Sequence, residues 1–352
     1  MSVVFAFASL ALDYGRVQLA RTELRTATDV AARWGVRWVN GGLAKALGRA
    51  NEAAGGNYVN GVKAAFNASQ IEVGYWNSSA RTFTPVLRPH NAVRLVTSVT
   101  VPLVFGGIIG MPTCTVRAST VARCLPIGIA GLNSIDFKNN TFIGSYDSSV
   151  TVTPTQVTAK NNGVLLSNGT IGGKNNGQMH GDIYVGPGGS VETGWAITGA
   201  VGNLSSAVPT PADPAWSPVG NPGGAGAACT GGSLVGGTYW LTSVNLSSNL
   251  TFTGPATLYV NGDININGRS ITAYQGIPSN LKIYQIGTNR TFSCGNGSSV
   301  KACISAPGSD FSSANGFDFF GVCVFRTITC QNNARFFFDE DAGTVEALAI
   351  VQ

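Results

Sequence analysis

The sequence predicts an α+β region followed by an all-β region: a long N-terminal helix with a small antiparallel sheet, then a right-handed β-helix or β-solenoid. Three observations predict this fold class. Residues 2–39 contain no proline and repeat apolar side chains every 3.5 residues. After about residue 70 the apolar period changes to two, which indicates strands. From about residue 126, short apolar pulses separated by Gly, Asn and Ser recur without a helical stretch.

Composition limits the function classes. Of the 352 residues, 44% are hydrophobic and only 11% are charged, and 46 are glycine. A low charge at ordinary hydrophobicity argues against a disordered chain. The net charge of +5 is spread without a Lys/Arg run, which argues against a nucleic-acid partner. The two histidines, His90 and His180, offer little material for metal or acid–base chemistry. We therefore expect an extracellular, β-rich structural chain.

The first helix is the predicted assembly element. Its start, Ser2 to Leu12, has no charge but is shorter than the roughly 20 residues that span a membrane. This start is therefore either the back half of a membrane segment or a helix end that is buried in an assembly. A helix of about 55 Å is too long for one small domain to cover, so packing against copies is favoured over packing on its own core. The predicted interface consists of Val3, Val4, Phe5, Phe7, Leu10, Leu12, Val17, Ala20, Leu24, Ala27, Ala31, Trp34 and Trp38.

A small α+β domain is expected over residues 41–125, after the helix at 1–40. Gly41 and Gly42 end the first helix, and further helices are expected at 43–54 and 59–67. The alternating pattern then predicts a hairpin of 71–76 with 81–86, and strands at 92–101 and 114–123. Residues 102–110 read as an apolar connection between the last two strands.

The short apolar pulses predict a solenoid in two parts, 126–206 and 229–352. In a solenoid each coil buries its apolar face only on its neighbours. Asn-rich turns are expected to stack as hydrogen-bonded ladders between coils. Residues 207–228 are rich in Pro and Gly and predict an extended loop between the two parts. A β-sandwich with many turns is the alternative fold for this region.

Two segments carry a family resemblance. The run Asp13-Tyr-Gly-Arg16, followed by Glu23-Leu-Arg-Thr-Ala-Thr-Asp-Val-Ala-Ala32, resembles the N-terminal helix of TadE/TadG-like, pilin-like proteins. The stretch from Asn91 to Cys124 fits the same family, so the resemblance covers about 125 residues. Trp34 and Trp38 depart from it, because small residues are usual there. The rest resembles the Gly/Asn-rich β-solenoids that follow such segments in bacterial surface proteins, planctomycetes among them. The closing run there usually ends His-Tyr-Asp-Glu, where this chain has Phe337 and Phe338 before Asp339. The resemblance implies location and architecture more than an activity.

The cysteines contain no zinc-type spacing. In an oxidising compartment the neighbours in sequence can pair, and the alternative is buried free thiols. Cys229 is the odd seventh cysteine. The candidate disulfide residues are Cys114, Cys124, Cys294, Cys303, Cys323 and Cys330.

No catalytic constellation, metal site or cofactor site is predicted, so we expect a protein that is not an enzyme. The only tight acidic cluster is Asp339-Glu340-Asp341, which we interpret as a solvated cap on the last coil, ahead of a cation site or a catalytic group. A β-helix enzyme acting on polysaccharide, with clustered carboxylates on one face, is the least favoured hypothesis.

The favoured function is a structural subunit of an extracellular, cell-surface filament or pilus. The expected partners are copies of the chain itself in a helical homopolymer, with membrane contact only before assembly and the solenoid displayed outside. The alternative is a membrane-anchored adhesin whose solenoid binds glycan or other cells. Its candidate binding aromatics are Trp195, Trp216, Tyr239, Trp240 and Tyr274.

Overall fold

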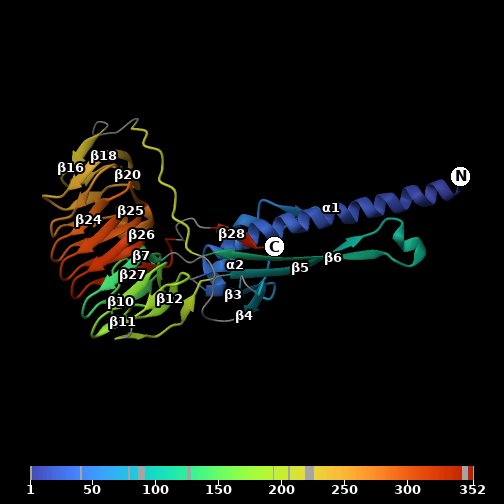
Figure 1. Ribbon diagram of the computed structural model, residues 1–352. Helices are drawn as coiled ribbons and strands as arrows, with labels where there is room; N and C mark the ends of the chain where they lie inside the picture. The colour runs from blue at the N-terminus through green and yellow to red at the C-terminus, as the bar shows by residue number, and fades with distance from the viewer. Residues whose placement is uncertain are drawn as a thin grey trace. The chain divides into compact units, whose positions relative to one another are not determined.

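A computed structural model shows the arrangement of the chain (Figure 1). It describes residues 2–39, 42–77, 80–85, 92–124, 128–192, 194–204, 207–218, 226–342 and 348–351. The side chains of residues 2–8, 42, 77, 124 and 348–351 lie outside that description. The chain forms two compact units, Met1–Cys124 with Leu348–Gln352, and Leu125–Ala347. The expected order, an N-terminal helix with a small sheet and then a large β-rich region, is confirmed.

The first unit packs two helices on an antiparallel sheet. Its helices are α1 (Ser2–Val36) and α2 (Gly42–Ala54). The sheet has the strand order β28-β6-β5-β3-β4, and each neighbouring pair is antiparallel. The strands are β3 (Ile71–Asn77), β4 (Thr82–Pro85), β5 (Ala92–Pro102), β6 (Thr113–Cys124) and β28 (Leu348–Val351). The predicted hairpin and the two predicted long strands are therefore confirmed.

One predicted helix is wrong. Residues 59–67 instead begin with a tight hairpin of β1 (Tyr58–Val59) and β2 (Val62–Lys63). Its two-residue turn is Asn60-Gly61, and both residues have positive φ, 50° and 79°. Asn-Gly is the dipeptide that a two-residue hairpin turn prefers, because both positions need left-handed backbone. This turn signal decides the local structure in place of the predicted helix.

The second unit is one parallel sheet. In the described residues many strands pair in parallel with the strand three places away, as β10 pairs with β7 and β13. Towards the end of the unit the short strands give way to long ones, since β22, β23 and β24 all pair with β25, which pairs with β26. The result is a stack of parallel strands (Figure 1). The strands are β7 (Ile129–Phe137), β8 (Phe142–Tyr146), β9 (Gly163–Ser167), β10 (Thr170–Gly173), β11 (Gly177–Met179), β12 (Gly181–Val185), β13 (Ser190–Val191), β14 (Trp195–Ile197), β15 (Val201–Asn203), β16 (Ala227–Cys229), β17 (Gly232–Leu234), β18 (Gly237–Asn245), β19 (Leu250–Phe252), β20 (Ala256–Val260), β21 (Ile264–Asn265), β22 (Ser270–Thr272), β23 (Leu281–Gln285), β24 (Arg290–Cys294), β25 (Ser299–Ser313), β26 (Asp318–Cys330) and β27 (Arg335–Asp339).

The order of stacking differs from the order in sequence. β26 and β27, near the end of the chain, pair in parallel with β7 and β8, which begin the unit. The stack therefore runs from β16 to β27 and continues directly from β7 to β15. Residues 207–218, which we call the strap, run back between the two ends as an extended segment without helix or strand (Figure 1).

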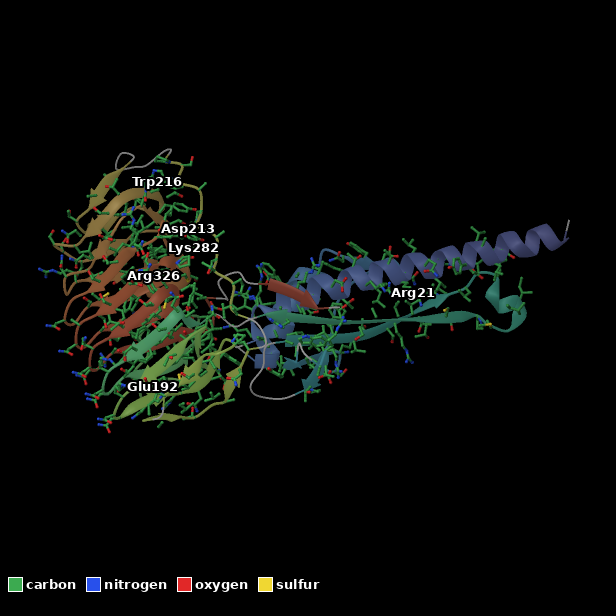
Figure 2. All side chains as sticks on the ribbon, in the orientation of Figure 1. Arg21, Glu192, Asp213, Trp216, Lys282 and Arg326 are labelled. Carbon is green, nitrogen blue, oxygen red and sulfur yellow. The ribbon has the colours of Figure 1, made fainter. Side chains whose placement is uncertain are left out.

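Three contacts hold the strap along the unit. Val208 is buried and exchanges two hydrogen bonds with the side chain of Asn168, at 2.7 and 3.1 Å. The Asp213 carboxylate accepts from the backbone N–H of Gly287 at 2.8 Å. Trp216 meets Trp240 edge-on, with ring centroids 5.4 Å apart. Figure 2 shows Asp213 and Trp216 on the strap, with Glu192 towards the other end of the unit.

The expected asparagine ladders are confirmed. Asn296, Asn315 and Asn332 each accept, through the side-chain oxygen, a hydrogen bond from the backbone N–H of the corresponding residue in the next turn, at 3.1 to 3.2 Å. Asn140 bonds to Asn333 on one side and to Asn176 on the other, and all three have positive φ. Asparagine tolerates this backbone region better than most residues, so it serves both the turn and the ladder.

Candidate assembly surface

Asp13 fastens α1 to the tip of the β5–β6 hairpin. Its two carboxylate oxygens accept from the backbone N–H groups of Val104, Phe105 and Gly106, at 2.7, 2.9 and 2.7 Å. Burial alone raises the pKa of this carboxyl, but the three donors outweigh it, and the pKa lies below its ordinary value. The side chain is only 5% exposed. α1 and the hairpin are therefore held side by side along their length (Figure 1).

Around the hydrogen bonds of Asp13, which we call the Asp13 staple, both α1 and the β5–β6 hairpin expose large apolar side chains. On α1 these are more than half exposed, and Ile108 at the hairpin tip reaches 82%. Residues 102–113 contain no charged residue, and the Asp13 carboxylate is buried against its three donors. Exposed apolar side chains that gather on neighbouring elements mark an interaction site. We call it the distal apolar surface; it comprises Leu10, Leu12, Tyr14, Leu19, Val104, Ile108, Ile109 and Met111.

The predicted interface divides into an inner and an outer part. Ala20, Leu24, Ala27 and Ala31 are buried in the core that α1 forms with α2 and the sheet, and Val17 packs at its margin. This inner stripe is covered within the chain and is not available to a copy. At Gly35, a Cβ would lie 3.0 Å from the backbone oxygen of Ala46, so α1 and α2 approach closely there.

The remaining predicted residues lie at the two ends of the helix. Leu10 and Leu12 are exposed, and they belong to the distal apolar surface. The side chains of Val3, Val4, Phe5 and Phe7 lie outside the described residues. Trp34 is 38% exposed beneath the guanidinium of Arg37, and Trp38 is half-buried beneath that of Arg49. Both tryptophans therefore bind arginines of their own unit by cation–π contacts.

The acidic residues of α1 all face inward. Besides Asp13, the Glu23 carboxylate accepts from the backbone N–H of Asn60 at 2.8 Å, and the Asp29 carboxylate accepts from the Thr120 hydroxyl at 2.7 Å. The sequence marked Asp13 only as part of a motif. Its role was not predictable because its three donors lie about ninety residues away.

Residues 19–122 match the family model described as Tad-like Flp pilus-assembly. These residues are a Tad-like pilus-related region. The Tad-like region contains the buried Ala20, Leu24, Ala27 and Ala31 of α1, strands β3 to β5, most of β6 and the hairpin tip, but it begins after Asp13 and leaves out β28. Residues 255–345 match a second model, a domain of unknown function (DUF7305). No curated protein and no solved structure matches the chain. In the described residues, no helix combines the length and hydropathy of a membrane span.

The acidic cluster at the end of the second unit is buried, so its prediction as a solvated cap is wrong. Asp339 and Glu340 are 0% and 5% exposed. Asp339 accepts from the backbone N–H groups of Ser148 and Asp341, each at 3.0 Å. Its other oxygen has no partner, and burial raises the pKa of this carboxyl to about 6. The cluster joins the two halves of the unit, because Ser148 follows β8 and Asp339 ends β27.

Glu340 binds both ends of the loop that follows β8 and runs to Lys160. It accepts from the Ser145 hydroxyl at 2.8 Å and the Asn162 amide at 2.7 Å, and it pairs with Lys160 at 3.2 Å. Ala159, near the end of the loop between Tyr146 and Lys160, packs against an aromatic cluster of Phe142, Tyr146, Phe320 and Phe337. These carboxylates are therefore structural clasps. In the described residues, no group of three or more His, Cys, Asp or Glu side chains could hold a metal ion.

The aromatic residues proposed for glycan binding are used in packing. Trp240 is 9% exposed and stacks on Tyr259, with centroids 4.1 Å apart, beneath Trp216 of the strap. Tyr239 is buried, and its hydroxyl donates to the backbone oxygen of Val235 at 2.8 Å. Trp195 and Tyr274 pack against the main core.

The predicted disulfides are not formed. The side chains of six cysteines are described, all but that of Cys124, and all six thiols are free. Cys114 and Cys124 lie ten residues apart on β6, which separates them by about 33 Å. Cys294 and Cys330 share a ladder but have Ser313 between them. Two strand spacings give about 9.6 Å, beyond the roughly 7 Å that a disulfide allows between Cα atoms. Cys303 and Cys323 lie on adjacent strands but one residue out of register, since Cys303 pairs with Val322.

Proposed function

We propose that this protein is a structural subunit of an extracellular filament or pilus, assembled through the N-terminal part of α1, and that it is not an enzyme. The observation that carries the proposal is the distal apolar surface. Its eight residues carry no charge, they come from two elements, and Asp13 holds these two elements together. The match of residues 19–122 to a pilus-assembly family supports a pilus-associated or cell-surface location.

The second unit is then the part displayed outside. We infer that this unit is a right-handed β-helix, because its strands stack in parallel on strands from the preceding and following layers along the whole unit. A head-to-tail contact through α1 that does not close on itself gives a fibre. The partners in this proposal are copies of the chain. An anchored adhesin has less support, since its candidate aromatics are taken up by packing within the unit.

The test is electron microscopy of the native material together with a chain that lacks residues 2–12. We expect regular fibres from the native protein. The shortened chain should keep its β-sheet circular dichroism but form no fibres. A matched control replaces the exposed Val150 and Val157 of the second unit, 80% and 95% exposed, by serine; this control should assemble normally. Fibres of native diameter from the shortened chain would contradict the proposal, and single particles on membranes would favour the adhesin.

A further inference from the structure

Lys160 and Glu340 are held side by side, although 180 residues separate them in the sequence. The backbone of Lys160 exchanges two hydrogen bonds with that of Ser145, at 2.7 and 3.0 Å. The backbone N–H of Glu340 donates to the backbone oxygen of Tyr146 at 2.8 Å. Two adjacent residues of β8 therefore anchor both partners, and Lys160 Nζ lies 3.2 Å from Glu340 Oε2.

The carboxyl group of Glu340 is buried and polarised. Its side chain is 3% exposed, and its oxygen Oε1 accepts from both the Ser145 hydroxyl and the Asn162 amide. The Ser145 Oγ in turn accepts from the backbone N–H of Asn162 at 2.9 Å, which fixes the hydroxyl in this orientation. Two donors on one carboxyl oxygen make the adjacent carbon Cδ more electrophilic. The same arrangement stabilises the negative oxygen of a tetrahedral intermediate.

Lys160 supplies a nucleophile beside this carbon. Its Nζ contacts Oε2, the oxygen of Glu340 that the two donors leave free, and Oε2 is directly bonded to Cδ. Well-oriented groups that are held together in this way react as if their concentration were on the order of 10⁵ M or more. An amide bond between the two side chains also removes a buried negative charge, and burial of charge is costly.

We propose that Lys160 and Glu340 join in an intramolecular isopeptide bond. The Lys160 ammonium first gives a proton to Oε2, which leaves a neutral amine and a carboxylic acid. Nζ then attacks Cδ, and the charge that develops on Oε1 is held by Ser145 and Asn162. A second proton passes from Nζ to Oε2, the Cδ–Oε2 bond breaks, and one water molecule leaves. The step consumes one ammonium and one carboxylate, and it forms one amide and one water without an oxidant or a cofactor.

The bond would lock the junction between the two halves of the second unit. Lys160 is anchored on β8, which belongs to the first half, and Glu340 directly follows β27, which ends the second half. At this junction β27 and β8 are joined only by strand pairing and side-chain contacts. The proposal is independent of the filament function, since both partners lie within one unit of one chain.

The ion pair of Lys174 with Glu192 provides a matched control. Its two charged atoms are closer, at 2.8 Å, but both side chains are exposed, 46% and 43%. Water therefore solvates this carboxylate, and its charge is not buried. We expect this pair to remain an ordinary ion pair.

The test is mass spectrometry of the full chain, kept folded at pH 7 and then denatured under reducing conditions. We expect a mass that is one water below that of the sequence. Trypsin should release residues 139–174 joined to residues 336–352, with Lys160 uncleaved. Lys160→Arg keeps the positive charge, but its guanidinium does not give up a proton, so this variant should have its full mass. Lys174→Arg should still lose one water. Circular dichroism checks that both variants keep the β-sheet.

The outcomes decide the proposal whether or not the chain forms fibres. The full sequence mass in the native chain would overturn it, and this measurement does not depend on the folding of a variant. A loss of water that persists in Lys160→Arg would also overturn it, because the reaction would then lie elsewhere. A loss of one ammonia, with Lys160 joined to Asn162, would identify the amide as the electrophile and overturn the assignment of Glu340.

Discussion

The side-chain oxygen of Asn332 accepts a hydrogen bond from the backbone N–H of Asn139 at 3.2 Å, although 193 residues separate them. This contact lies where the last strands of the second unit stack on its first strands. On one side of this contact, Asn315 and Asn296 make the same type of hydrogen bond in the preceding layers. At the contact itself, β26 pairs in parallel with β7. The junction between the two halves therefore uses the same asparagine bond as the two preceding steps of the stack.

Asn140 tests how much the asparagine ladder contributes to this junction. Replacement by glycine keeps the positive-φ backbone but removes the bonds to Asn333 and Asn176, so we expect a loss of about 1 kcal/mol in the free energy of unfolding. Replacement by alanine should cost about 1 kcal/mol more, because alanine resists that backbone region. Urea unfolding followed by circular dichroism measures both. Equal stability of the glycine variant and the native chain would show that the ladder contributes nothing.

The staple at Asp13 predicts a local effect in the first unit. Asp13→Ala removes the acceptor of three backbone donors, so the amides of residues 104–106 should lose their protection in hydrogen exchange. Since the pKa of the carboxyl is lowered in the fold, the staple is present above the ordinary carboxyl pKa and is lost as pH falls through the folded value. Asp13→Asn should retain part of the protection. Thr22→Ala, on the same helix, is the control and should leave these amides unchanged.

Sequence periodicity predicted what depends on local spacing. The helix of 35 residues, the strands β5 and β6 and the hairpin β3–β4 all follow from apolar periods of 3.5 or two. The turn at Asn60-Gly61 has an equally local signal, the Asn-Gly dipeptide, which the prediction of a helix at 59–67 missed.

What depends on distant pairing could not be read in this way. The inner stripe has the spacing of a helix seam whether its partner is a copy or the chain's own sheet, and only the fold decides. The burial of Asp339 depends on strand β8, nearly two hundred residues earlier. The sequence of three adjacent acidic residues alone cannot distinguish buried carboxylates that join two strands from a solvated group at the end of the unit.

Asp339 predicts an unusual dependence of stability on pH. Its folded pKa of about 6 lies above the unfolded value near 3.9. The folded state holds the proton more tightly, so the stabilisation is complete below about pH 4 and is lost as pH rises through 6. The two-unit shift corresponds to about 3 kcal/mol. Asp339→Asn should remove this loss of stability at high pH. The variant should therefore unfold at a higher temperature than the native chain at pH 8.

A matched carboxylate should behave in the opposite way. Asp310 is bound by Arg326 and Thr327, which lower its pKa. Asp310→Asn should therefore reduce stability at pH 8 and matter less as pH falls. If Asp339→Asn also destabilised the chain at pH 8, the Asp339 carboxylate would be ionised and paired in the folded state, and its raised pKa would be wrong.

The cysteines give a prediction about chemistry rather than stability. Cys294, Cys323 and Cys330 are buried, and burial raises the pKa of each thiol, of Cys330 to about 12. Since the thiolate is the reactive form, these three should stay unmodified when the folded chain is treated with a maleimide at pH 7. Cys114, on β6 and only half-buried, should react. Mass spectrometry of peptides identifies the labelled sites, and labelling of all seven cysteines in denaturant without reductant is expected. A cysteine that stays unlabelled in denaturant until a reductant is added would reveal a disulfide and contradict this prediction. The strand geometry excludes such a bond between Cys294 and Cys330 and between Cys114 and Cys124.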